Sequence, residues 1–164
     1  MKKISLLIIF LIAYCSISFS QSADWGGIVR LKPLDLISGF KNDVFCIRAA
    51  VVPSINRSLG VPIEIDLLST KKGEGFGIYS GFEAVRGGKR ERNGLYGSMV
   101  AGPNIIFAYG GSVVALYFRA VMGYQMVTNF GLVLTPAIGF QKVLSDVGFY
   151  VMLDIGFAWG KKFR

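Results

Sequence analysis

The sequence predicts an all-β protein: an eight-stranded antiparallel up-and-down transmembrane β-barrel, a meander that follows a cleaved signal peptide. Three observations predict this fold. A basic and then apolar segment opens the chain, hydrophobic residues alternate with small or polar ones through most of the remainder, and short turn sequences separate the alternating segments. The 164 residues suffice for one domain with a single interior.

Residues 1–20 have the features of a signal peptide. Lys2 and Lys3 precede an apolar run over residues 4–13, and small residues at Ser18 and Ser20 suit a signal peptidase that would leave Gln21 as the first residue. Residues 21–164 are then the barrel domain, exported to the bacterial outer membrane. Two alternatives stay open, an uncleaved anchor and lipidation of Cys15.

Composition favours a sheet that faces lipid. The chain is 52% hydrophobic and 17% charged, with 21 glycines, whereas soluble domains average about 25% charged residues. The net charge is +8, and without Lys2 and Lys3 it is 16 − 10 = +6. Such a basic excess favours anionic lipid or lipopolysaccharide phosphates as partners. An exported apolar barrel makes nucleic acid the least expected partner.

The sequence contains no histidine, which removes the commonest general base and the commonest metal ligand. Signal removal would leave Cys46 as the one cysteine, so no internal disulfide can form. We therefore expect no catalytic residue, metal or cofactor. Cys46 is expected to fill space in the barrel interior, called the lumen below.

Strict alternation marks the strands. Over residues 147–159 every odd position is apolar, which a strand separates onto one face and a helix would scatter. Residues 43–52, 59–67, 112–122 and 130–141 alternate in the same way. Weaker strands are expected at 27–37, 75–85 and 94–107. Turn sequences lie between them, at 38–39, 54–57, 71–74, 87–93, 110–111, 128–129 and 145–146.

The less apolar face decides which side is inside. It carries mostly Gly, Ala, Ser and Tyr, too small and too nearly neutral for a water-facing surface, so it is expected to line a narrow lumen with paired charges. The expected lumen charges are Arg48, Glu64, Asp66, Glu83, Arg119 and Asp154. The apolar face would then meet lipid. Phe149, Phe157 and Trp159 are expected in its aromatic girdles, because the ten residues from Phe149 to Trp159 span about 33 Å, which projects to about 25 Å in a tilted strand.

Two features oppose this interpretation. Pro33, Pro62, Pro103 and Pro136 fall within expected strands, and a closed barrel has no free edge for them. Residues 105–127 are apolar enough to suggest a spanning helix, although Arg119 and a glycine pair interrupt them. A soluble barrel of lipocalin type, with the apolar face inside, is the other alternative fold.

The C-terminal sequence LDIGFAWGKKF, residues 153–163, resembles the terminal strand of small outer-membrane barrels of the OmpA- and OmpX-like class. The opening LKPLDLISG, residues 31–39, is similar to the start of uncharacterised bacterial barrels. The resemblance implies that Phe157, Trp159 and Phe163 form an assembly signal that the barrel assembly machinery reads. Arg164 follows Phe163, whereas members of the class usually end on the aromatic residue.

Several functions are compatible with such a barrel. Barrel enzymes that modify lipid A resemble the fold but need a histidine, and eight strands leave a lumen too narrow for a general pore. A structural or interaction role at the cell envelope is therefore expected, with a periplasmic ligand-binding barrel or a histidine-free lipid-modifying enzyme as alternatives. Lys71 and Lys72 are candidate lipopolysaccharide contacts, whereas Arg86, Lys89, Arg90 and Arg92 are expected in a solvated turn.

Overall fold

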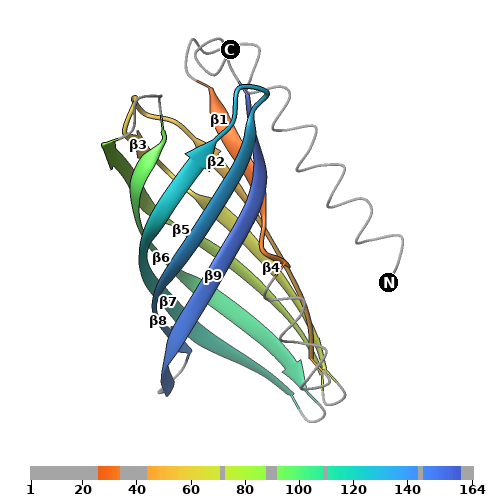
Figure 1. The fold of residues 1–164 in the computed structure, drawn as a ribbon. Helices are drawn as coiled ribbons and strands as arrows, with labels where there is room; N and C mark the ends of the chain where they lie inside the picture. Colours follow the sequence, from red (N-terminus) through yellow and green to blue (C-terminus); the bar gives the residue numbers. More distant parts are fainter. Residues whose placement is uncertain are drawn as a thin grey trace.

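A computed structural model describes residues 26–33, 44–70, 73–87, 92–108, 111–143 and 146–159. Its named elements are all β-strands (Figure 1). They are β1 (Gly27–Leu31), β2 (Val44–Pro53), β3 (Leu59–Gly60), β4 (Ile63–Thr70), β5 (Gly73–Gly87), β6 (Gly94–Ala108), β7 (Gly111–Val127), β8 (Leu132–Val143) and β9 (Asp146–Trp159). The expected signal peptide lies outside the described residues.

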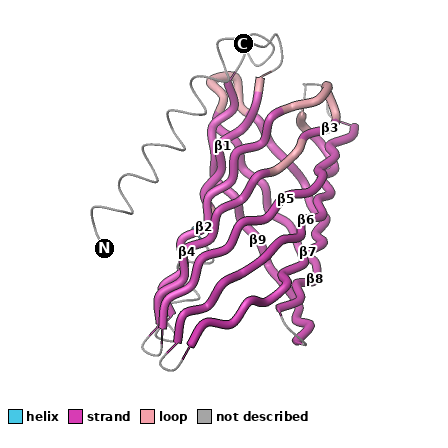
Figure 2. Tube along the Cα trace, turned by 180° about the vertical axis from the view of Figure 1, so that it is seen from behind, coloured by secondary structure: helices cyan, strands magenta, loops and turns pink. Residues whose placement is uncertain are grey.

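The strands close into a ring. Apart from the short β3, each strand pairs antiparallel with the next along the chain, and β2 pairs with β4. β1 also pairs with β9, so that Gly27 lies opposite Trp159. β3 and β4 share one place in the ring, because both pair with β5 in a single register that breaks only at Val61-Pro62. The barrel thus has eight strand positions, as predicted, and Figure 2 shows the same closed wall from behind.

The prolines occupy interruptions in the hydrogen-bond ladder. Pro62 separates β3 from β4. The β5–β6 register omits Pro103, and the β7–β8 register omits Pro136, although both residues keep a partner on their other side. Proline has no N–H to donate, so each break falls where its missing donor would have been needed. The prolines are therefore compatible with a closed barrel.

The strand boundaries differ from the sequence prediction in several places. The first strand was expected over 27–37, but β1 ends at Leu31 and Pro33 lies beyond it. Most later strands are longer than expected, β7 most of all. Residues 105–108 and 111–127 belong to β6 and β7, so the alternative of a spanning helix there is wrong. No helix among the described residues is long and apolar enough to cross a membrane.

The two ends of the barrel can be defined from the pairing. The terminus end holds Gly27, Pro53 and Trp159, which lie side by side. It also holds the connections after β2, β5 and β7. The far end holds the connections after β1, β4, β6 and β8. The far-end connections at 71–72, 109–110 and 144–145 lie outside the described residues.

Side chains alternate between the lumen and the outer surface along every strand. In β7, Ala115, Tyr117 and Arg119 are buried, whereas Leu116 and Phe118 between them are exposed. The predicted division into two faces is confirmed here, and the apolar face is the outer one. A barrel with its bulky apolar residues inside is therefore wrong for this chain.

Candidate functional site: an ion-paired lumen

Glycines make room for the large side chains of the lumen. Large residues on one strand face glycines on the next, and these pairs are Tyr96–Gly123, Tyr117–Gly102, Tyr150–Gly139 and Arg30–Gly156. At Gly139 an inward Cβ would lie against the backbone carbonyl oxygen of Ala120, closer than non-bonded atoms approach. The glycine content seen in the sequence therefore reflects a narrow, densely filled interior.

Gly139→Ala should destabilise the barrel by at least about 2 kcal/mol, because the added methyl forces the β7–β8 ladder apart. Gly148→Ala is a matched control, since Gly148 also faces inward, on β9, but a Cβ there meets nothing within 4 Å. Urea unfolding of both variants, followed by the gel mobility of the unheated protein, measures the difference. Equal stability of the two variants would contradict the close packing described at Gly139.

All six predicted lumen charges are buried inside the barrel. Nearest the far end, Arg48 and Asp66 lie opposite each other on β2 and β4 and form an ion pair, with Nη2 and Oδ2 2.6 Å apart. The Tyr79 hydroxyl donates to the same Oδ2 at 3.2 Å, and the Cys46 thiol donates to Oδ1 at 2.9 Å. Cys46 thus fills space, as expected, and also satisfies a buried carboxylate.

Glu64 is the centre of a second group. It accepts from Lys32 Nζ at 3.0 Å and from Arg119 Nη2 at 2.6 Å, both at Oε1. Lys32 also lies 3.6 Å from Oδ2 of Asp154. The Arg119 guanidinium stacks over the ring of Tyr150 at 5.5 Å. Two cations and two carboxylates therefore balance in the middle of the lumen, with Glu64 shared between the cations.

A third group lies toward the terminus end. Arg30 forms a two-pronged pair with Glu83, with N–O distances of 2.6 and 3.1 Å. Arg30 also donates to the Gln125 side chain and, at 3.3 Å, to the Tyr96 hydroxyl. Arg92 forms a second ion pair with Glu83. This group therefore carries two cations for one carboxylate.

The position of Arg92 corrects the sequence prediction. It was expected in a solvated basic turn, but its side chain points into the lumen and the residue is only 2% exposed. Burial lowers the pKa of the Arg92 guanidinium to about 10, with a further lowering by Arg30, so it remains cationic at neutral pH. Arg86 is exposed as expected, but it belongs to strand β5 and not to a turn, while Lys89 and Arg90 lie outside the described residues.

Sequence reasoning missed three lumen cations, which are Arg30, Lys32 and Arg92. Arg30 and Lys32 could have been found, because they lie two and four residues after the inward-facing Ile28. Alternate residues of a strand point to the same face. The sequence placed the tyrosines on the less apolar face, but it did not predict that their hydroxyl groups would hydrogen-bond with the buried charges. No group of three His, Cys, Asp or Glu residues that could hold a metal occurs in the described part of the chain.

Fold and interior together define an eight-stranded antiparallel barrel whose lumen is filled by side chains and ion pairs. No family model matches the chain, and no curated protein or solved structure matches it.

Proposed function

We propose that this protein is a small bacterial outer-membrane barrel of the OmpA- and OmpX-like class, with a structural or interaction role at the cell envelope. It is neither a general pore nor an enzyme. The observation that carries the proposal is the distribution of charge on the outer surface. Among the outward strand side chains that the structure describes, only Glu74, Arg86 and Lys142 are charged, and each is the second residue from a strand end.

The surface between those strand ends is apolar and exposed. Met122 is 69% exposed and Leu116 is 70% exposed, both within β7. Exposed apolar residues of this kind lie on most of the strands: Leu31, Ile63, Ile78, Phe82, Leu95, Met99, Phe107, Val114, Phe118, Tyr124, Met126, Ile138, Phe140, Val147, Phe149, Val151, Ile155 and Phe157. A continuous uncharged belt of this size is typical of a barrel surface that faces lipid, and this supports the proposal. Closure of the ring also supports a membrane location, because lipid cannot form hydrogen bonds with the backbone N–H and C=O groups of an open strand edge.

Aromatic residues stand at both ends of this belt. On β9, Phe149 lies toward the far end and stacks edge-on against Phe140 of β8, with ring centroids 6.2 Å apart. Phe157 and Trp159 lie at the terminus end, and Trp159 covers Gly27 of the neighbouring strand. Aromatic rings are favoured at the level of the lipid headgroups. These residues suit the two girdles of a membrane barrel.

The contents of the lumen support a role without transport or catalysis. Arg30, Arg119, Tyr79 and Tyr117 are fully buried large side chains that occupy the axis. Glu64 and Asp66 form ion pairs with Lys32 and Arg48 of the barrel itself. These lumen carboxylates are thus engaged with the protein's own cations. A histidine-free sequence further argues against the lipid A-modifying mechanisms known for small barrels.

Membrane fractionation tests the proposal. Expressed in a Gram-negative host with its N-terminal segment intact, the protein should sediment with outer membranes and migrate faster on a gel when it is not heated. Recovery in the soluble periplasmic fraction would instead support a ligand-binding barrel. Sustained ion conductance by the purified protein in a planar bilayer would contradict the filled lumen.

The proposed partners are outer-membrane lipids and the barrel assembly machinery. The latter would read Phe157, Trp159 and Phe163, the last of which lies outside the described residues. Lipopolysaccharide is proposed to contact Lys71 and Lys72, which follow β4 in sequence and also lie outside the described residues.

Reversing both charges with Lys71→Glu and Lys72→Glu should reduce the lipopolysaccharide that copurifies with the barrel, because phosphate contacts are lost. The matched control is Arg57→Glu, which changes an exposed arginine at the terminus end. Unchanged retention in the double variant, measured on equal amounts of folded protein, would dispose of this contact.

A further inference from the structure

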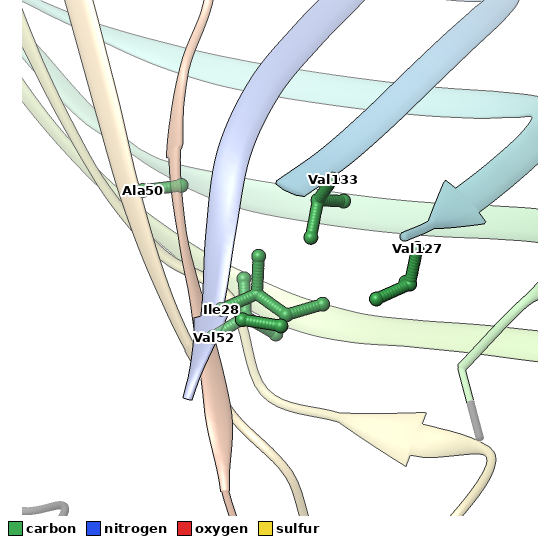
Figure 3. Packing of buried hydrophobic residues seen from close by; sticks show 6 residues of the cluster. Ile28, Ala50, Val52, Val127 and Val133 are labelled. Atoms are coloured by element: carbon green, nitrogen blue, oxygen red, sulfur yellow. The ribbon is translucent and has the colours of Figure 1, made fainter. Parts of the chain in front are cut away.

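The terminus end of the lumen is closed by an apolar layer that is incomplete on one side. Its six residues are Ile28, Ala50, Val52, Val127, Val133 and Ala158. Figure 3 shows Ile28 and Val52 facing Val127 and Val133 across the interior. These residues come from β1, β2, β7, β8 and β9. On the side of β5 and β6 the layer has none of its six residues, because the buried Val85 and Tyr96 of these strands belong to a separate cluster.

Arg92, just before β6, occupies this side. Its Nη1 lies 3.4 Å from the Ser54 hydroxyl, and its guanidinium also contacts Glu83 of β5. A Cβ built on Gly60 would meet Arg92 Nη1 at 2.6 Å and Val52 Cγ1 at 2.8 Å. The guanidinium therefore lies across Gly60, beside the apolar layer, and completes the closure.

The backbone of Arg92 is held in an unusual conformation. Its φ of 56° is the one positive value among the described non-glycine residues. Gly87 and Gly94, on either side of this connection, also have positive φ values, but glycine adopts them without strain. A left-handed backbone is disfavoured for arginine. It persists here because both ends of the residue are fixed, the guanidinium by Glu83 and the carbonyl oxygen by Gln125 Nε2. Strain held by surrounding contacts is typical of a residue with a specific task.

We propose that Arg92 is a removable plug that seals the terminus end of the lumen against water and small solutes. The other sealing residues belong to strands of the barrel wall, whereas Arg92 belongs to a turn. Its side chain can therefore leave the lumen mouth without any loss of strand pairing. The inference does not depend on where the protein resides, since the seal is a property of the barrel itself.

A thiol placed below the plug tests this. Thr135 is fully buried, and its hydroxyl lies 3.5 Å from Oε1 of Gln125, the residue that holds Arg92. Thr135→Cys is introduced with Cys15→Ser and Cys46→Ser, so that it is the single thiol. Its rate of modification by methyl methanethiosulfonate, a small neutral reagent, is then measured in detergent with and without Arg92→Gly. We expect at least about a tenfold faster reaction when the plug is removed.

Two further variants make the test specific. Arg86→Gly removes an exposed arginine from the same hairpin and should leave the rate unchanged, and Arg92→Gly should keep the gel mobility of a folded barrel. An unchanged rate in a folded Arg92→Gly variant overturns the proposal. So does an equal acceleration by Arg86→Gly, which would indicate general loosening. Failure of Arg92→Gly to fold also overturns it, because Arg92 would then belong to the frame of the barrel.

Discussion

Glu64→Ala should destabilise the barrel by about 3–5 kcal/mol, the largest loss expected from a single side chain in the lumen. Glu64 is the shared acceptor of Lys32 and Arg119, and all three side chains are buried. Its removal takes away the described ion-pair partner of Arg119 and leaves Lys32 with the more distant Asp154 as its carboxylate among the described residues. An unpaired buried cation costs far more than the pair itself contributes.

Urea titration of the folded protein in detergent micelles measures this loss. Glu74→Ala serves as the control, because Glu74 is an exposed carboxylate on β5 near the far end. It should change the unfolding free energy by less than about 0.5 kcal/mol. Comparable effects of the two substitutions would show that the central ion-paired group contributes nothing specific to stability.

Met122→Arg should destabilise the folded barrel in lipid bilayers by about 2–4 kcal/mol. Met122 faces outward near the middle of β7, away from the charged residues at the strand ends. An arginine there would be forced toward the hydrocarbon of the bilayer. In a water-facing barrel the same substitution at an exposed site would change stability by about 0.5 kcal/mol or less.

The matched variant for Met122→Arg is Ser112→Arg, also outward on β7 but one residue from its far end. Lipid-face penalties fall to about 0–1 kcal/mol near the membrane interface. Equilibrium unfolding from vesicles should therefore separate the two variants clearly. If both cost the same small amount, the outer surface of the barrel does not contact acyl chains.

The period-two pattern was sufficient to predict the two faces and the eight strands. It worked because inward and outward residues differ in size as well as polarity, as in β9, where Phe149 and Val151 face outward and Asp154 faces the lumen. Strand ends were less predictable. β1 stops at Leu31, and β7 runs on to Val127, which pairs with Val133 of β8. Pairing with neighbouring strands sets these limits, and local alternation does not.

Ion-pair partners were only partly accessible from sequence. Arg48 and Asp66 lie directly opposite each other on neighbouring strands, so a correct register would reveal them. Arg119 of β7 and Glu64 of β4 are not neighbours in the sheet, and only closure of the ring brings them to 2.6 Å. Arg92 was misplaced because a basic turn is ordinarily solvated, whereas its left-handed backbone directs this side chain inward.

Quenching of tryptophan fluorescence by brominated lipids tests the central claim most directly, namely that the outer apolar surface contacts acyl chains. Met122→Trp would be combined with Trp25→Phe and Trp159→Phe, and the protein refolded into vesicles whose lipids carry bromine at different depths. We predict the strongest quenching by bromine near the bilayer centre. Equal weak quenching at all depths, with a folded barrel, would place that surface in water and contradict the account.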